Sequence, residues 1–362
     1  MSLEEFSEII DPSSYNGNGF CEGYEARRHR SQNTAIAGSQ RCRADFTISV
    51  GGLNLDDIVT YENEVHGHIV TVLMPHVRPE RMELMSYLSE YFCLHDDQQD
   101  FADRDTELAM HRKLARKQLL GKMLAQFTAV DQTQSQAVIV ALMQYTKIAA
   151  TLKHSTNFRS IEAYIEYRFH DYASEFILAA TMFGMDMDPM SAEERDTMEP
   201  FIRLGFQAMS LINDYFSFDI EYASTPDKGA LINGVSVLMR LHCLGVAEAR
   251  EGLKTIAIGF DQEYMRRWNA LRSQGSLSDK LQTLLSAIAY QMVGKMIWSQ
   301  TTLRYNVAYR LGNRKRTDSV TQDSIVQRRE RNDSVIDKAV AGDAVKVTVV
   351  EVAPTDVERV QA

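Results

Sequence analysis

The chain has 362 residues, enough for one large domain or two smaller ones with a sizeable buried core. Hydrophobic residues make up 44% and charged residues 24%, which is the composition of an ordinary soluble globular protein. Because 39 basic and 49 acidic residues leave a formal charge of −10, we expect no nucleic-acid partner.

The sequence contains four scattered cysteines, Cys21, Cys42, Cys93 and Cys243. None has the spacing of a zinc or dithiol motif, which favours reduced thiols inside the cell. The N-terminus has no signal-peptide pattern, and the strongest apolar runs, residues 137–143 and 176–185, are far shorter than the roughly 18 residues of a membrane span. We predict a cytoplasmic protein without a membrane span; the composition leaves open whether it forms a homo-oligomer.

Residues 1 to about 55 are polar and contain several glycines and serines, without a clear helical or strand pattern. Basic side chains are frequent in this segment, at Arg27, Arg28, Arg30, Arg41 and Arg43. We therefore expect residues 1–55 to be irregular.

From about residue 61 to residue 310, apolar residues recur every three or four positions, as on the buried face of a helix. Examples are the rows Leu84, Leu88, Tyr91, Phe92 and Leu281, Leu284, Ile288, Met292. The prolines that we expect between helices are Pro75, Pro79, Pro189, Pro200 and Pro226. The pattern predicts one all-α domain, a single bundle of about ten helices.

From Asn313 onward the sequence is rich in charge, has no aromatic residue and repeats a short D-S-V element at Asp318 and Asp333. Such a segment cannot bury enough apolar surface to fold by itself. Residues 345–352 have the composition of a strand, but the sequence offers them no partner strand. We expect residues 313–362 to be a disordered tail or a linker to another domain.

The first acidic motif is HDDQQD at residues 95–100, at the end of a helical apolar row. Asp96 and Asp100 are four residues apart and therefore point to the same side of a helix, with Asp97 beside them. Carboxylates at the C-terminal end of a helix are disfavoured by the helix dipole, by about 0.3 to 1 kcal/mol each. Taken alone, this motif fits either a metal site or a solvated acidic helix end.

The second motif lies in LINDYFSFDIEY, residues 211–222, where Asn213, Ser217 and Glu221 recur every four residues. On a helix this spacing makes a narrow strip of oxygen-bearing groups among apolar and aromatic side chains. Mg²⁺ accepts such oxygens and completes its shell with water and substrate phosphates. Two such helix faces across a cavity would hold magnesium ions with a phosphate group between them, so the two motifs together predict a magnesium site.

The two motifs resemble those of class I terpene cyclases. HDDQQD matches the aspartate-rich DD-x-x-D element of that family. The second motif matches its ND-x-x-S-x-x-x-E element at Asn213, Asp214, Ser217 and Glu221.

Two further motifs match in the order and spacing of that family. YRFHDY places Arg168 and Asp171 where these cyclases have a diphosphate-sensing arginine and its linker aspartate. WSQTTLRY places Arg304 and Tyr305 where they have a terminal Arg-Tyr pair that contacts the diphosphate. The segment CEGYEARR and the WS-x-x-x-x-RY ending are most similar to the cyclase domain of fungal chimeric di- and sesterterpene synthases of the fusicoccadiene synthase type.

The resemblance implies a class I terpenoid synthase fold over residues 1–312, with helices around a central active-site cavity. Residues 1–55 would then either cap the site when metal and diphosphate bind or form a solvated surface. In the fungal chimeras a prenyltransferase domain follows the linker. The substrate would come from such a domain or from a separate prenyl diphosphate synthase.

The resemblance also implies the role of each motif. Asp96 would bind metal directly, with Asp97 and Asp100 assisting. Further metal ligands would be Asn213, Ser217 and Glu221, giving a site for three magnesium ions. The diphosphate would be bound by Arg168 with its linker Asp171, by Arg304 and by Tyr305. The residues expected to carry the reaction are Asp96, Arg168, Asn213, Ser217, Glu221, Arg304 and Tyr305.

A carbocation formed in such a site needs an apolar cavity whose aromatic faces stabilise positive charge without attacking it. The candidates for this lining are Phe92, Phe176, Phe216, Trp298 and Phe169, and ordinary core packing is the alternative for each. His95 is expected to have a structural role, because magnesium prefers oxygen ligands.

We therefore predict a magnesium-dependent terpene cyclase that ionises geranylgeranyl diphosphate, cyclises the cation to a polycyclic diterpene hydrocarbon and releases diphosphate. The alternatives are a sesterterpene cyclase that uses geranylfarnesyl diphosphate and a trans-prenyltransferase. The latter would need a second DDxxD on the opposing helix, where this sequence has Asn213, Ser217 and Glu221. A helical scaffold with solvated acidic patches would not explain why four motifs agree.

Overall fold

The structure is a computed structural model that describes residues 3–50, 63, 65–100, 107–152, 157–275 and 277–306. For residues 3–4, 96–100 and 107–110 it describes the backbone alone. The expected tail, residues 313–362 with the strand-like stretch 345–352, lies outside the described residues, so the boundary at residue 312 stays a prediction.

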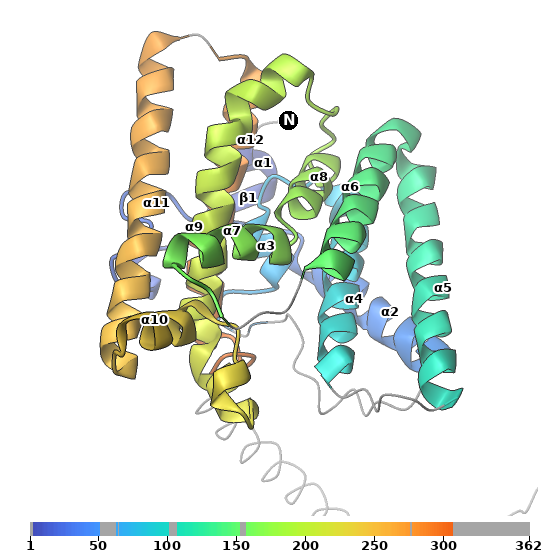
Figure 1. The fold of residues 1–362 in the computed structure, drawn as a ribbon. Helices are drawn as coiled ribbons and strands as arrows, with labels where there is room; N and C mark the ends of the chain where they lie inside the picture. Colours follow the sequence, from blue (N-terminus) through green and yellow to red (C-terminus); the bar gives the residue numbers. More distant parts are fainter. Residues whose placement is uncertain are drawn as a thin grey trace, which may run out of the picture. The chain divides into compact units, whose positions relative to one another are not determined.

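The described residues are mostly helical, with one small two-stranded sheet near the N-terminus (Figure 1). The α-helices are α1 (Leu3–Phe6), α2 (Gln32–Val50), α3 (Ile69–Leu73), α4 (Met82–Asp100), α5 (Glu107–Val130), α6 (Gln132–Thr151), α7 (Ile161–Asp171), α8 (Ser174–Gly184), α9 (Ala192–Ser224), α10 (Gly234–His242), α11 (Val246–Gln274) and α12 (Asp279–Thr301). The strands are β1 (Ser7–Ile9) and β2 (Arg27–His29), and short 3₁₀ turns occupy Pro12–Ser14, Pro79–Arg81 and Lys228–Ala230. The predicted all-α architecture is confirmed.

Helix α9 is the long helix around which the second half of the domain packs. It lies against α11 and α12 and also contacts α7 and α10 (Figure 1). A capping box starts it, because Ser191 Oγ accepts the backbone N–H of Glu194 and the Glu194 carboxylate accepts that of Ser191. At Gly205 a Cβ would lie 2.3 Å from Ile288 of α12, so a larger residue would not permit this close approach.

Pro200 lies inside α9, and the expectation that it separates two helices is wrong. The capping box at Ser191 begins the helix well before the proline. Buried apolar residues, including Met198 and Phe201, continue on both sides of it. This packing stabilises one continuous helix and compensates for the loss of the backbone hydrogen bond that proline cannot donate.

Helix α2 occupies residues 32–50, so the expectation of an irregular segment through residue 55 is wrong for this stretch. Its buried stripe consists mainly of small residues at helical spacing, Ala35, Gly38, Ser39, Cys42 and Phe46. Small side chains allow α4 to come close: a Cβ on Gly38 would lie 2.2 Å from the Glu83 carbonyl oxygen. Close backbone packing therefore holds most of this helix, with Phe46 and Val50 burying larger side chains toward its end.

The basic residues of the N-terminal segment are used within the fold. Each of them forms an ion pair with a glutamate: Arg27 with Glu25, Arg28 and Arg30 with Glu8, Arg41 with Glu83, and Arg43 with Glu90. The segment also docks on α11, where the Cys21 N–H donates to Asp261 Oδ2 at 2.9 Å and the Tyr24 hydroxyl donates to the Asp261 carbonyl at 2.6 Å. The described part of this segment is therefore an integral part of the domain.

Two clusters of buried side chains make up the core. One lies among the N-terminal segment, α7 and α9–α12, and the other among α2–α6 and Trp298. Helix α8 contributes to both, with Leu178 in the first and Phe176 and Phe183 in the second. None of the helices in the described ranges has a stretch apolar enough, and of sufficient length, to cross a membrane.

Candidate active site

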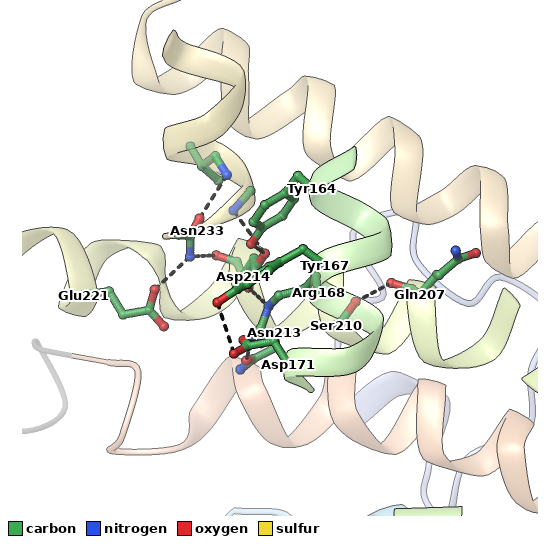
Figure 2. A network of polar contacts seen from close by, with 12 residues as sticks. Tyr164, Tyr167, Arg168, Asp171, Gln207, Ser210, Asn213, Asp214, Glu221 and Asn233 are labelled. Carbon is green, nitrogen blue, oxygen red and sulfur yellow. Dashed lines mark hydrogen bonds and ion pairs between the residues drawn. The ribbon is translucent and has the colours of Figure 1, made fainter. Parts of the chain in front are cut away.

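The polar strip of α9 lies at a junction of several elements (Figure 2). Asn213 Oδ1 accepts from Arg168 Nη2 of α7 at 2.9 Å, and Asn213 Nδ2 donates to the Tyr305 hydroxyl at 2.7 Å. One turn later Ser217 Oγ is buried and makes no hydrogen bond of ordinary geometry. After another turn, Glu221 Oε2 accepts from Asn233 Nδ2 at 2.9 Å. The strip therefore meets polar partners within the molecule, with Ser217 buried and Asn213 and Glu221 partly buried.

Asp214, next to this strip, is the buried centre of the network (Figure 2). Its carboxylate accepts from Arg168 Nε at 3.0 Å, from the Tyr164 hydroxyl and from the backbone N–H of Gly234 at 3.0 Å. Burial raises the pKa of Asp214, and the adjacent Arg168 guanidinium opposes this shift. Asp214 thus joins α7, α9 and the start of α10 at one point.

Arg168 connects two predicted motifs through a single guanidinium. Besides Asn213 and Asp214, it donates through Nη1 to Asp171 Oδ2 at 2.7 Å. Burial lowers the pKa of Arg168, but the negative charges of Asp214 and Asp171 have the larger effect, so that the pKa of Arg168 is raised. The structure therefore brings together Arg168, Asp171 and Asn213, as the sequence predicted, with a permanently charged group beside the strip.

The segment after α12 reaches both motif-bearing helices. The Tyr305 hydroxyl accepts from Asn213 Nδ2 of α9, and Arg304 Nη1 lies 3.1 Å from the Cys93 sulfur of α4. Cys93 is one helical turn before the first aspartates of the acidic motif. The Arg304–Tyr305 dipeptide therefore spans the distance between the two helices that carry the motifs.

The acidic motif itself is described in part. Helix α4 continues through Asp100, so the motif is helical, but the side chains of Asp96, Asp97 and Asp100 lie outside the described residues. His95 is described: its ring lies 6.0 Å from that of Tyr91, and burial, followed by the charge of Arg116, lowers its pKa. Metal binding by the three aspartates stays a prediction.

The candidate aromatic residues divide between several places. Phe92 of α4 and Phe176 of α8 pack together, with ring centroids 5.1 Å apart. Trp298 is fully buried and meets the Tyr305 ring edge-on at 5.7 Å. Phe216 instead packs near Phe20 of the N-terminal segment, at 6.0 Å. The buried ring of Phe169 lies 4.8 Å beneath the guanidinium carbon of Arg203.

The described residues of the α9 strip fit a divalent cation chemically. They are an amide, a hydroxyl and a carboxylate, which are hard oxygen donors suited to magnesium. Ser217 Oγ is buried without a hydrogen bond of ordinary geometry, and it lies close enough to the Glu221 carboxylate to oppose the rise that burial causes in the pKa of that group. Burial, followed by the charge of Asp214, raises the pKa of Glu221, and a nearby cation would reverse this shift. No group of three or more His, Cys, Asp or Glu side chains in metal-binding proximity occurs among the residues that the structure describes.

Three residues of the site could not be found from sequence patterns. Tyr164 donates to Asp214, Asn233 bridges Glu221 and the Asp214 carbonyl, and Lys295 Nζ donates to the Tyr305 hydroxyl at 3.1 Å. Tyr164 and Asn233 belong to no recognised motif. The only signal for Lys295 was a charged residue within the apolar run of α12, QMVGKMIW.

The chain matches known terpene synthases in sequence. Residues 87–257 match the family described as terpene synthase family 2, C-terminal metal binding. A variediene synthase of Emericella variicolor is 30% identical over 318 residues, which is 83% of this chain and 44% of that protein. A fusicoccadiene synthase of Phomopsis amygdali is 24% identical over 330 residues, which is 83% of this chain and 45% of that protein. The chain thus spans less than half the length of these two relatives.

The fold is similar to that of solved terpene synthases. Aristolochene synthase from Penicillium roqueforti aligns with a TM-score of 0.53 and 17% identity, over 72% of this chain and 95% of that structure. At this identity the likeness establishes the fold, while the sequence relatives establish the homology. The chain is a homologue of the fungal terpene synthases and has the all-α fold of the class I terpene synthases.

Proposed function

We propose that the protein is a magnesium-dependent terpene cyclase that ionises a linear prenyl diphosphate and cyclises the resulting carbocation to a hydrocarbon. The observation that carries the proposal is the link made by Arg304 and Tyr305, which contact Cys93 of α4 and Asn213 of α9. This link joins α4 one turn before its acidic motif to the first residue of the α9 strip, which supports the binding of metal and diphosphate between the two motifs.

The cationic and hydroxyl groups of the site are suited to a diphosphate leaving group. Arg168 and Arg304 carry guanidiniums, whose planar donors match phosphate oxygens, and Tyr305 adds a hydroxyl. Magnesium, held by Asn213, Ser217 and Glu221 and by the aspartates of α4, would supply further positive charge to the diphosphate. Donors fixed in place before the reaction stabilise the charge that develops as the C–O bond breaks.

We expect Arg168 to contact the diphosphate from beside the expected metal site. In this structure its guanidinium holds Asn213 Oδ1, the atom that we expect to bind metal. A carbonyl oxygen has two lone pairs, so Asn213 Oδ1 could bind metal while it accepts from Arg168, and the guanidinium N–H groups not used in these bonds could donate to the diphosphate. Asp171 and Asp214 hold the guanidinium beside Asn213.

The apolar chain of the substrate must react away from water. Phe92 is one turn before Asp96 on α4, and its ring packs on Phe176, so this aromatic pair extends from the acidic motif into the second core cluster. Such faces stabilise a carbocation without adding to it. We propose geranylgeranyl diphosphate as the substrate and a polycyclic diterpene as the product, with geranylfarnesyl diphosphate as the alternative.

Substitutions on one helix test the metal strip. We expect Asn213→Ala and Glu221→Ala each to lower turnover by about 100-fold or more, because each removes an expected metal ligand, while circular dichroism stays helical. Asp219→Asn is the matched control: Asp219 is two residues from Glu221, its side chain is 62% exposed, and it pairs with Arg250. Near-normal turnover of both alanine variants would overturn the assignment of the strip to metal binding.

A further inference from the structure

Helix α12 carries a lysine in the interior of the domain, next to the candidate active site. Lys295 is only 5% exposed, and its Nζ lies 3.1 Å from the Tyr305 hydroxyl oxygen. The same Nζ lies 5.3 Å from the centroid of the Trp298 ring and 5.1 Å from that of Tyr305. Burying an amine is costly, so this position calls for an explanation beyond packing.

The partners of Lys295 do not explain it as a structural ion pair. Among the residues that the structure describes, no carboxylate lies within 4.0 Å of its Nζ. Lys280 of the same helix shows the usual arrangement: it pairs with Glu194 at 2.7 Å and also donates to the Pro189 carbonyl at 3.0 Å. The Lys295 ammonium has three hydrogens and meets one oxygen acceptor in the described part of the chain.

The Tyr305 hydroxyl is arranged so that its own hydrogen is available. It accepts from Lys295 Nζ at 3.1 Å and from Asn213 Nδ2 at 2.7 Å. An oxygen that accepts two hydrogen bonds directs its remaining O–H away from both donors. Lys295 and Asn213 thus both donate to Tyr305, and Arg168 donates to Asn213, which leaves the Tyr305 O–H and further Lys295 hydrogens for another acceptor.

We propose that Lys295 is a further binding residue for the diphosphate group, acting together with Arg168, Arg304 and Tyr305. The inference rests on the proposed function and deepens it, because it adds a cation on α12 to those supplied by α7 and by the segment after α12. None of the four sequence motifs includes this position.

The charges around Lys295 agree with an anion as the missing partner. Burial, followed by the guanidiniums of Arg304 and Arg168, lowers the pKa of Lys295 to about 7, while Glu221 and Asp214 act in the opposite direction. A multiply charged anion among these three cations would favour the protonated amine. Bound diphosphate would therefore keep the amine protonated and accept the hydrogen bonds that it does not make to Tyr305.

Calorimetric titration of the full chain with inorganic diphosphate, in saturating magnesium, tests the proposal. We expect Lys295→Met to raise the dissociation constant about tenfold, because a charge-assisted contact is lost. Lys280→Met removes the same charge from the same helix and should leave the constant within about twofold. Affinity for geranylgeraniol, which lacks the diphosphate, should change little in either variant, whereas a general loss of packing would weaken it too.

The outcomes separate this inference from the proposed function. If the unsubstituted chain binds no diphosphate with magnesium, the proposed function fails. If it binds diphosphate and Lys295→Met binds it equally well, Lys295 is a structural residue and only this inference fails. Lys295→Gln, which keeps a donor to Tyr305 without the charge, gives the same comparison if Lys295→Met loses its helical circular dichroism.

Discussion

Asp214 shows how one buried residue organises the site. Asn213 and Asp214 are neighbours, but Asn213 faces Arg168 and Tyr305 while Asp214 points into the protein. There it gathers Tyr164, Arg168 and the backbone N–H of Gly234. We infer that Asp214 is a positioning residue, which fixes Arg168, the arginine that we propose to contact the diphosphate.

Replacing Asp214 by asparagine tests this role. Because Arg168 would lose its most buried counter-charge, we expect the free energy of unfolding in urea to fall by about 3–5 kcal/mol. Turnover should fall as well, since the guanidinium would no longer be fixed beside Asn213. Asp219→Asn serves again as the control. Unchanged stability and turnover in Asp214→Asn would show that Arg168 is held by its other partners.

The sequence predicted those residues of the site that share one helix face or one short motif. Asn213, Ser217 and Glu221 could be found because the helical repeat places them together. Tyr164 and Asn233 could not, because they contact the motif from α7 and from the segment before α10 and have no periodicity of their own. Lys295 was hidden in the same way, inside an apolar helix.

At the scale of elements, the apolar pattern located the helices that bury large side chains and missed those that do not. Helix α2 buries mainly small residues against α4, so its row of Ala35, Gly38 and Cys42 gives a weak hydrophobic signal. At Pro200 the error was the opposite one: the proline predicted a break between helices, but buried side chains on both sides of it stabilise α9 as one helix. In both cases tertiary contacts, which no local pattern records, decide the outcome.

The docking of the N-terminal segment on α11 predicts a pH dependence. Asp261 is buried and accepts from the Cys21 N–H, and burial raises its pKa from the ordinary 3.8 to about 7. The folded chain therefore binds a proton more tightly than the unfolded chain, and the stability that this proton gives is present below pH 4. It is lost as the pH rises from about 4 to about 7, by up to about 4 kcal/mol.

Asp261→Asn isolates this contribution, because an amide keeps the acceptor oxygen and cannot ionise. We expect urea unfolding of this variant to lack the part of the decline between pH 4 and pH 7 that is due to Asp261. It should therefore be more stable than the unsubstituted chain at pH 8. Parallel stability curves for the two proteins would contradict the assignment of a raised pKa to Asp261.

At the scale of the whole molecule, residues 87–257 carry the family match and the helices reproduce the fold of terpene synthases. The site depends on parts far apart in the chain, because Asn213 of α9 meets Tyr305 after α12, and Arg304 meets Cys93 of α4. The resemblance to class I terpene cyclases implied that residues from these distant motifs share one site. The proposed chain length of the substrate and the proposed ring pattern of the product would depend on side-chain packing, which residue spacing does not encode.

The most direct test is gas chromatography with mass spectrometry of the products formed from prenyl diphosphates of increasing length, with and without magnesium. We expect a cyclic hydrocarbon and free diphosphate from geranylgeranyl diphosphate, only when magnesium is present. Geranylfarnesyl diphosphate as the preferred substrate would change the chain length and leave the chemistry intact. Absence of hydrocarbon from every diphosphate, or a longer diphosphate formed only with isopentenyl diphosphate, would contradict the cyclase assignment.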